Sequence, residues 1–346
     1  MGKLLRLVAP RTVDIVDDVE TPLGPKQVRI QTLFSGISAG TELTMYRGSN
    51  PYLNKRWDAA RRLFVSQGSA LEYPLDGVGY EEVGRVVELG AQVSSVSHGD
   101  VIWGAWGHRG SVVFDEEYAA TRKLPAGVEP IIGIFSEIGA IALNVVLDGD
   151  IHVGETVAVF GLGVPGQIVA QLARLNGARV VGVDRIAARL ATAAQLGADE
   201  VIDGGTMDAG ERIRELTDGR GADVALEVSG SYRALHEAVR ATAYSGRVVA
   251  AGFFQGEGVG LAMGEEFHHN RIQVVCSQIS GVAPALTYRW DKNRLLQTAM
   301  DLAASSRLQL APLITEVVPL DQAGAAFASL DASPDRALQV VLEFPQ

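Results

Sequence analysis

Residues 157–184 read VAVFGLGVPGQIVAQLARLNGARVVGVD. An apolar run ends at Phe160, a Gly-x-Gly-x-x-Gly turn follows at 161–166, and a helix-like segment leads to a second apolar run that ends at Asp184. A strand, a glycine-rich turn, a helix and a strand ending in an acidic residue are, in this order, the fingerprint of a dinucleotide site. The chain is therefore predicted to bind NAD or a closely similar dinucleotide.

The residues of the turn have separate predicted roles. Gly161 permits the tight turn, Gly163 lets the backbone approach a pyrophosphate, and Gly166 lets the following helix pack closely on the sheet. Val164 and Pro165 lie where the helix N-terminus presents unpaired N–H groups and a partial positive charge to the phosphates. We expect these five residues to hold the pyrophosphate.

The acidic residue at the end of the second run bears on the choice of cofactor. Asp184 is predicted to accept hydrogen bonds from the adenosine ribose hydroxyls and to repel a 2′-phosphate, which favours NAD over NADP. Arg185 beside it points the other way, because a guanidinium could meet that phosphate or stack on adenine.

Composition limits the class of protein. The chain has 346 residues, enough for about two domains, with 47% hydrophobic and 21% charged residues. Its net charge of −11 argues against nucleic acid and against anionic membranes as partners. No uninterrupted apolar run approaches the roughly 20 residues of a membrane span. A small-molecule substrate fits this composition best.

Two further features concern the compartment. The N-terminal residues alternate charge too soon for a signal peptide. The single cysteine, Cys276, excludes an internal disulfide and a cysteine-rich zinc lobe. We therefore expect a cytoplasmic protein.

The pattern of apolar runs changes near the middle of the chain. Up to about Asp150 the chain is glycine-rich with short β-branched runs, which is typical of a small β-barrel-like domain. From about Gly154 strand-like runs alternate with helix-like segments, which predicts a doubly wound parallel sheet. We predict an α/β protein, with residues 1–150 and 286–346 in the first domain and 151–285 in a dinucleotide-binding Rossmann domain. The strand-like run 337–344 would return to the first domain.

The first half holds two further motifs, Ser35-Gly-Ile-Ser38-Ala39-Gly40-Thr41-Glu42 and Gly79-Tyr80-Glu81-Glu82-Val83-Gly84. With the dinucleotide turn, they resemble the medium-chain dehydrogenase/reductase family, whose best-known members are zinc alcohol and polyol dehydrogenases. The resemblance covers essentially the whole chain and implies a GroES-like catalytic domain before the nucleotide domain. Within the family the motifs are similar to those of bacteriochlorophyllide hydroxyethyl dehydrogenases, which oxidise a secondary alcohol to a ketone with NAD.

The chain departs from the family at the metal positions. The family's Gly-Ile-Cys-Gly-Thr-Asp places its thiolate on Ser38 or Ala39 here, and its Gly-His-Glu becomes Gly-Tyr80-Glu81. Glu137 takes the place of the glutamate on the helix that enters the nucleotide domain. Zinc prefers nitrogen and sulfur donors in a tetrahedral set. We therefore place the chain in a zinc-less branch and predict no catalytic zinc.

Without zinc, a side-chain donor must stabilise the substrate oxygen. Tyr80 is the first candidate, because a phenol can donate to an oxyanion and shuttle a proton; alternatively it only fills the vacated metal cavity. Glu81 and Glu137 would form a carboxylate pair in which repulsion or burial raises one pKa, or else a structural pair. Thr41 matches the family's hydroxyl relay and Ser38 could serve instead, unless these hydroxyls only stabilise a turn.

Two aromatic segments are candidates for the substrate pocket. Trp103, Trp106 and His108 lie between glycines and could line a pocket or fill a shortened loop. Trp57 lies in the basic segment 54–64, whose apolar residues have helical spacing. That segment is predicted to form either a lid helix that presents arginines to an anionic or bulky substrate or a surface helix packed on the barrel.

The leading hypothesis is a zinc-independent oxidoreductase that transfers a hydride between NAD(H) and a secondary alcohol or ketone, with a bulky, polyol-like or anionic substrate. An ene or quinone reductase using NAD(P)H and a non-catalytic cofactor-binding protein are the alternatives. The strand-like run 273–277 lies where relatives join two sheets, which predicts a homodimer or a tetramer built from one.

Overall fold

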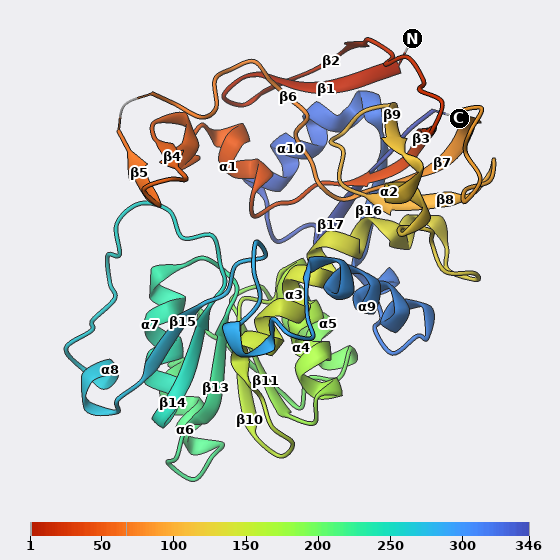
Figure 1. The fold of residues 1–346 in the computed structure, drawn as a ribbon. Helices are drawn as coiled ribbons and strands as arrows, with labels where there is room; N and C mark the ends of the chain where they lie inside the picture. Colours follow the sequence, from red (N-terminus) through yellow and green to blue (C-terminus); the bar gives the residue numbers. More distant parts are fainter. Residues whose placement is uncertain (1, 67, 346) are drawn as a thin grey trace. The chain divides into compact units, whose positions relative to one another are not determined.

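The computed structural model describes residues 2–66 and 68–345, which divide into two compact units (Figure 1). The first, called here the β unit, comprises Met1–Glu137 with Ile314–Gln346. The second, called here the α/β unit, comprises Ile138–Leu313.

These boundaries differ from those expected at residues 150/151 and 285/286. The reason is that helix α3 (Ser136–Gly149) and helix α9 (Lys292–Ala304) pack closely within the α/β unit. A Cβ added at Gly139 would come 2.9 Å from the Cβ of Ala299, so the two helices approach almost at backbone contact. Both helices therefore belong mainly to the α/β unit, whereas the sequence pattern had assigned them to the first domain.

The β unit contains two main sheets. The smaller one has the order β2-β1-β6, with strands β1 (Gly2–Ala9), β2 (Thr12–Asp18) and β6 (Leu75–Asp76). The larger one has the order β16-β17-β3-β7-β8, and β9 also pairs with β3. Its strands are β3 (Gln27–Gly36), β7 (Glu82–Leu89), β8 (Val101–Gly104), β9 (Ser111–Asp115), β16 (Ile314–Pro319) and β17 (Gln339–Glu343). The strand expected at the C-terminal end is confirmed, because β17 pairs antiparallel with β3.

Helices cover part of this unit. They are α1 (Glu42–Arg47), α2 (Glu116–Ala120) and α10 (Ala323–Ala332). Phe327 of α10 is fully buried in a core that also contains Leu5 and Leu7 of β1. This core holds the N-terminal and C-terminal segments of the unit together.

The pairing of β3 with β7 brings the two sequence motifs of the first half together. The strands are antiparallel, and Ser35 lies opposite Glu82. Beyond the ladder, the Gly36 N–H donates to the Glu81 carbonyl at 2.8 Å. Because the last residues of one strand face the first residues of the other, the segments containing Ser38 and Tyr80 become neighbours.

The α/β unit has one sheet in which all strands are parallel, in the order β12-β11-β10-β13-β14-β15. The strands are β10 (Thr156–Phe160), β11 (Arg179–Asp184), β12 (Glu200–Asp203), β13 (Ala222–Glu227), β14 (Thr242–Ala250) and β15 (Gln273–Cys276). Every residue of β10 is buried, as expected for a central strand covered on both faces. The predicted doubly wound parallel sheet is confirmed.

Four helices follow the strands of this sheet (Figure 1). They are α4 (Val164–Leu175), α5 (Ala187–Gln195), α6 (Ala209–Glu215) and α7 (Tyr232–Ala241). Helix α4 contacts α5, and α6 contacts α7. The strand order reverses between β10 and β13, and in such sheets ligands bind at this switch point, beyond the carboxyl ends of the strands.

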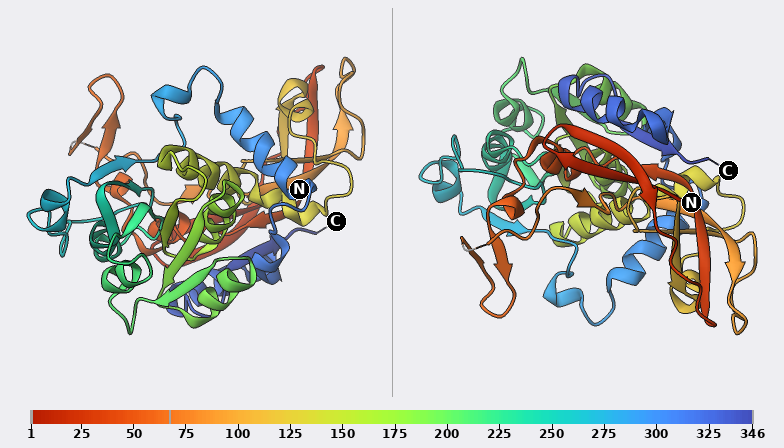
Figure 2. Two further views of the ribbon diagram at one scale, coloured as in Figure 1. Left: turned by 90° about the horizontal axis from the view of Figure 1, so that it is seen from below. Right: turned by 90° about the horizontal axis from the view of Figure 1, so that it is seen from above.

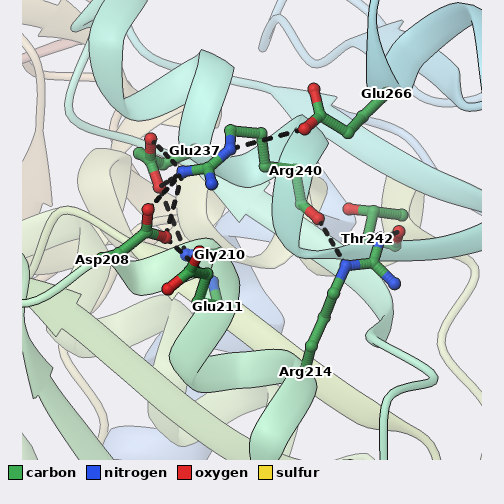
Figure 3. Close-up of polar contacts among 8 residues, drawn as sticks. All are labelled: Asp208, Gly210, Glu211, Arg214, Glu237, Arg240, Thr242 and Glu266. Carbon is green, nitrogen blue, oxygen red and sulfur yellow. Dashed lines mark hydrogen bonds and ion pairs between the residues drawn. The ribbon is translucent and has the colours of Figure 1, made fainter.

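One arginine ties three helices of this unit together (Figure 3). The Arg240 Nη1 group lies 2.9–3.0 Å from the carboxylate oxygens of Asp208 and Glu237, and its Nε lies 3.6 Å from Glu266 Oε1. Asp208 caps α6, Glu237 belongs to α7, and Glu266 opens the short helix α8 (Glu266–His269). The guanidinium therefore fixes the segment that leads into β15, the last strand of the sheet.

The helix predicted over residues 54–64 is wrong. The segment forms a hairpin of β4 (Arg56–Asp58) and β5 (Leu63–Val65), which stands clear of the sheets of its own unit in both views of Figure 2. The Asp58 carboxylate accepts the N–H groups of Ala60 and Arg61, and this turn outweighs the helical spacing of the apolar residues. Trp57 packs on Phe64 but stays 42% exposed.

One segment of the described chain, Pro130–Gly149, is long and apolar enough to cross a membrane. Its sequence is not an uninterrupted apolar run, because Glu137 and Asn144 lie within it. Seventy-two per cent of its most apolar window is buried in the folded protein. This burial is the pattern of a core helix.

Candidate active site

Two hydroxyl groups meet in the β unit where β3 ends and β7 begins. The Ser38 hydroxyl lies 2.5 Å from the Tyr80 hydroxyl, and the Thr41 hydroxyl is also hydrogen-bonded to Tyr80. Ser38 is buried, whereas Tyr80 is only half-buried. Of the two positions left open for the family's thiolate, Ala39 is exposed and Ser38 joins this pair.

The Tyr80 phenol holds its proton firmly. Burial raises its pKa well above the ordinary value of about 10, and the charge of Glu81 raises it further. The hydrogen bonds from Ser38 and Thr41 act in the opposite direction but do not reverse the shift. Tyr80 is therefore a hydrogen-bond donor at neutral pH and not a base.

The neighbouring carboxyl group of Glu81 is buried, with an exposed fraction of 1%. Among the described residues its Oε2 atom has no hydrogen-bond partner. The space for it exists because residue 36 is glycine: a Cβ there would come 2.5 Å from that oxygen. Burial raises the pKa of Glu81 well above its usual range, and the charges of Glu42, Glu82 and Glu137 add to the shift. Glu81 is thus a carboxyl group that retains its proton far above ordinary acidic pH.

Glu137 lies in the first turn of α3, at the end of the β unit's first segment, and is 9% exposed. Its charge acts on Glu81, which places the two carboxyl groups in one electrostatic neighbourhood. The charge of Glu137 thus contributes to the raised pKa of Glu81, and the paired role of the two carboxyl groups stays a prediction.

Sequence reasoning missed a second, fully buried network behind these groups. Glu42 accepts the Ser38 N–H through Oε1 at 2.9 Å, and its Oε2 lies 2.7 Å from His108 Nε2. On the other side of the imidazole, Nδ1 lies 2.5 Å from the Ser35 hydroxyl, which donates to Glu82 Oε1 at 3.1 Å. In the sequence, only Glu42 at the end of the first motif indicated a buried acidic group. Its partner could not be identified there, because His108 lies 66 residues away.

Trp103, Trp106 and His108, for which the sequence left pocket lining and filling of a shortened loop as alternatives, are all buried. Their exposed fractions are 2%, 9% and 0%. Trp106 donates its indole N–H to Thr32 at 3.0 Å and its backbone N–H to Glu82 at 2.6 Å. These side chains fill and fix the interior of the β unit.

Two groups of the buried network have perturbed proton affinities. Burial lowers the pKa of His108, but the charge and the hydrogen bond of Glu42 outweigh it, so that the pKa lies above the ordinary value of 6.5. Burial raises the pKa of Glu82 to about 7, against the opposing influence of His108 and of the Trp106 N–H. The two shifts favour the protonated form of both His108 and Glu82.

In the α/β unit, the glycine-rich turn has the geometry expected from the sequence. Gly161 has a positive φ of 92°, and a Cβ there would come 2.6 Å from the Cβ of Ser229. A Cβ at Gly166 would come 1.8 Å from the Gly161 carbonyl oxygen. Both positions therefore require glycine for the fold itself, since any side chain would collide with the chain.

Gly163 differs from its two neighbours. It caps α4, which begins at Val164 with Pro165 in its first turn, and a Cβ there would meet no atom of the chain closer than 3.9 Å. The fold does not need glycine at this position. A ligand that approaches the backbone closely would need it, as the pyrophosphate does in dinucleotide sites.

Asp184 is more deeply engaged with the chain than the sequence suggested. One carboxylate oxygen accepts the Leu162 N–H at 2.6 Å, and the other accepts the N–H groups of Arg185 and Ile186 at 2.7 and 3.0 Å. A carboxylate has about four lone-pair positions, so these bonds leave limited capacity for a ribose hydroxyl. Asp184 thus ties the glycine-rich turn to the end of β11.

Two more residues border this turn and carried no prediction. The Arg189 guanidinium of α5 lies 3.9 Å from the position of a Cβ on Gly163. Glu227 ends β13, accepts the N–H groups of Ser229 and Gly230 at 2.9 and 3.2 Å, and has its pKa raised to about 7 by burial. The position of Arg189 on the helix after Asp184 could have indicated that it borders the turn. The contacts of Glu227 with the segment after β13 are seen only in the folded structure.

The comparisons with known proteins agree with this geometry. Residues 165–293 match the family model described as zinc-binding dehydrogenase. The chain is 29% identical to D-guloside 3-dehydrogenase of Escherichia coli over 349 residues, which are 99% of this chain and 100% of that protein. The chain is thus similar over residues 165–293 to zinc-binding dehydrogenases, and over almost its whole length to a dehydrogenase of a D-guloside.

Solved structures share the fold of this chain. The (2R,3R)-butanediol dehydrogenase of Bacillus subtilis superposes with a TM-score of 0.79 and 23% identity over 100% of both chains. A Sinorhizobium meliloti protein described as a zinc-binding dehydrogenase, solved with NADP, has a TM-score of 0.79 and 23% identity over 99% of both chains. Dehydrogenases of this fold therefore include proteins that bind a nicotinamide cofactor.

The residues at the zinc positions of the medium-chain dehydrogenase/reductase family do not fit zinc. Ser38 and Tyr80 offer hydroxyl groups that already hydrogen-bond each other, and Glu81 offers a carboxyl group of raised pKa. Within residues 2–66 and 68–345, no three His, Cys, Asp or Glu side chains are grouped so that they could hold a metal ion. Zinc prefers thiolate and imidazole donors, and this donor set contains neither.

The glycine-rich turn yields a matched pair of substitutions. We expect Gly163→Ala to fold normally and to weaken NADH binding by about 10-fold or more, because the new methyl group occupies space that only the cofactor uses. Gly166→Ala should also lower the melting temperature, because its methyl group collides with the Gly161 carbonyl. Fluorescence titration with NADH and thermal unfolding measure both. Equal destabilisation by the two substitutions would contradict this assignment.

The buried Glu82 makes stability depend on pH. Its pKa of about 7 in the folded chain lies above the ordinary value of 4.5, so the folded state binds this proton more tightly. The resulting stabilisation is complete below pH 4.5 and is lost as the pH rises through 7. The free energy of unfolding of Glu82→Gln should therefore rise relative to wild type between pH 5 and pH 8.

Urea unfolding at several pH values measures this difference. Glu116→Gln is the control: backbone hydrogen bonds from Ser94 and Ser95 lower the pKa of Glu116, so its relative stability should stay nearly constant between pH 5 and pH 8 and change only at lower pH. Parallel pH curves for wild type and Glu82→Gln would mean that Glu82 is already ionised at acidic pH.

Proposed function

We propose that this protein is a zinc-independent, NAD-linked dehydrogenase that interconverts a secondary alcohol and a ketone. The observation that carries the proposal is the pair of hydroxyl groups of Ser38 and Tyr80, 2.5 Å apart, at the position where the zinc-dependent members place their metal ligands. A protein hydroxyl group thereby takes over the task of polarising the substrate oxygen.

The chemistry divides into a hydride and a proton. The turn of Gly161, Gly163 and Gly166 would hold a nicotinamide dinucleotide, which would take up the hydride from the alcohol carbon or supply it to the ketone carbon. The residues of the chain handle the oxygen: in the reducing direction this oxygen gains negative charge and must receive a proton. Donors placed beforehand at such an oxygen stabilise the transition state, and removal of one typically costs about 10²–10³ in rate.

Tyr80 serves as that donor. Its raised pKa keeps the phenol protonated at neutral pH, and the bonds from Ser38 and Thr41 orient the hydroxyl group. The adjacent Glu81, with its own raised pKa, serves as the proton reserve for the site, and the charge of Glu137 helps to keep that proton in place. A donor and a reserve proton together replace the Lewis acid of the zinc enzymes.

The assignment of NAD rests on Asp184. Its negative charge at the end of β11 would repel a 2′-phosphate, although three backbone N–H groups already satisfy much of its acceptor capacity. Arg185 and Arg189 are the first two cations that follow Asp184 in the sequence, and the Sinorhizobium meliloti protein was solved with NADP. A 2′-phosphate would have to be neutralised by one of these two guanidinium groups.

The substrate class follows from relatives and from the hairpin. The relatives described above act, by name, on a D-guloside and on butanediol, both of which carry secondary hydroxyl groups. The hairpin of β4 and β5 presents Trp57 beside the exposed residues Arg61 and Arg62. We propose a polyol-like substrate, with the hairpin favouring a bulky or anionic one.

We also propose that two copies of the chain pair through β15. This strand ends the parallel sheet, and Val274 and Cys276 on it are exposed. An uncovered strand at the edge of a sheet presents free N–H and carbonyl groups to a partner strand. A homodimer formed in this way, or a tetramer built from it, would cover the edge.

Turnover assays test the proposed activity. We expect oxidation of NADH by a panel of keto sugars and polyol-derived ketones, and little oxidation by conjugated enones or quinones. Tyr80→Phe should lower kcat by about 10² without weakening NADH binding, because the cofactor turn is untouched. Preferential turnover of enones with NADPH would support a reductase of conjugated double bonds, and tight NADH binding without any turnover would support a non-catalytic protein.

Zinc independence is tested by metal analysis of protein purified without chelators. We expect substoichiometric zinc, and activity that survives dialysis against a chelator, because the donor set lacks thiolate and imidazole. The double variant Glu81→Gln/Glu137→Gln tests the carboxyl groups in the same experiment. It should have lower activity than wild type after dialysis as well as before it. One equivalent of zinc per chain, with activity lost on its removal, would refute the proposal.

A further inference from the structure

We propose that His108, through Glu42, is the positioning residue that holds the Ser38–Tyr80 pair in its reactive geometry. This inference rests on the proposed function for its catalytic consequence, but its structural part stands on the contacts of the β unit alone.

The argument begins with burial. The side chains of His108 and Glu42 are fully buried and face each other across 2.7 Å. A buried imidazole and a buried carboxylate are expensive to desolvate, and apolar residues of similar size would fill the same space with less loss. The β unit thus retains a costly polar pair in its interior, next to its candidate active site.

The second step is the direction of the hydrogen bonds. The Ser35 hydroxyl has one hydrogen and donates it to Glu82, so its contact with His108 Nδ1 requires the imidazole to donate on that side. His108 Nε2 then faces Glu42 Oε2, and a protonated Nε2 donates to that oxygen. The imidazole is held at both nitrogens and cannot rotate without breaking two hydrogen bonds.

The third step links this pair to the candidate donor. Glu42 has two carboxylate oxygens, one bound to His108 and the other accepting the Ser38 backbone N–H at 2.9 Å. Residue 38 therefore receives its position from a carboxylate whose orientation His108 sets. The Ser38 hydroxyl lies 2.5 Å from Tyr80. A displacement of Glu42 or His108 would therefore also displace Ser38 relative to Tyr80.

A pair of substitutions separates this role from simple filling of space. Glutamine places its amide nitrogen near the position of imidazole Nε2, whereas asparagine places it near Nδ1. His108→Gln can thus still donate to Glu42, while His108→Asn keeps only the contact toward Ser35. Both variants are neutral and polar, so loss of charge affects them alike.

The first readout is hydrogen exchange of the Ser38 amide, which needs no activity. We expect its exchange rate to rise at least 10-fold in His108→Asn and to stay close to wild type in His108→Gln. The Val86 amide, which bonds to the Asp100 carbonyl at 2.9 Å, is the internal control and should not change. Equal Ser38 exchange in both variants overturns the proposal.

The second readout is kinetic. We expect kcat to fall by about 10–100-fold in His108→Asn and by much less in His108→Gln, with KM for NADH unchanged in both, because a misplaced catalytic group lowers the rate of the chemical step. Equal kcat values in the two variants overturn the positioning role. If wild type turns over no substrate, the proposed function fails, while the exchange data still decide the structural inference.

A second variant covers the case in which His108→Asn does not fold. Glu42→Gln keeps the size of the side chain but removes the charge that binds the imidazole. We expect faster Ser38 exchange and a lower kcat than in wild type. Unchanged Ser38 exchange in a folded Glu42→Gln protein overturns the proposal.

Discussion

The carboxylate of Glu42 connects the interior of the β unit to its candidate active site. It is fully buried, and each of its oxygens has one partner, the Ser38 N–H and His108 Nε2. A buried carboxylate must find such partners, because an unpaired charge in the interior would cost several kcal/mol. The requirement to satisfy Glu42 therefore dictates where the Ser38 segment and the His108 loop lie relative to each other.

A concentration of acidic groups surrounds this carboxylate. Glu81, Glu82 and Glu137 lie near enough to influence one another, and His108 is the one basic group in the buried network described above. Burial and the repulsion of neighbouring carboxylates raise the pKa of Glu81 and of Glu82, so protons can balance part of the negative charge. This arrangement is consistent with a site in which hydroxyl and carboxyl groups, and not a Lewis acid, deal with the substrate oxygen.

The α/β unit follows a different physical logic. Its site is made by backbone approach: Gly161 and Gly166 are glycine because the chain itself leaves no room for a Cβ, whereas at Gly163 the chain leaves room. Asp184 then secures the turn through three backbone N–H groups. The glycines and one carboxylate thus produce a preformed surface of N–H groups at the switch point of the sheet, which is what an anionic pyrophosphate requires.

The sequence by itself determined the parallel sheet and the glycine-rich turn, and it indicated that the Ser38 and Tyr80 motifs serve the same site. These features depend on local patterns of apolar residues and glycines. It predicted a helix at residues 54–64, where the structure has a hairpin, because the turn at Asp58 outweighed the helical spacing of the apolar residues. Only the tertiary structure decided that His108 is a buried partner of Glu42, and that burial raises the pKa of Glu81. Burial and pairing across 66 residues are properties of the packed chain, and no local pattern encodes them.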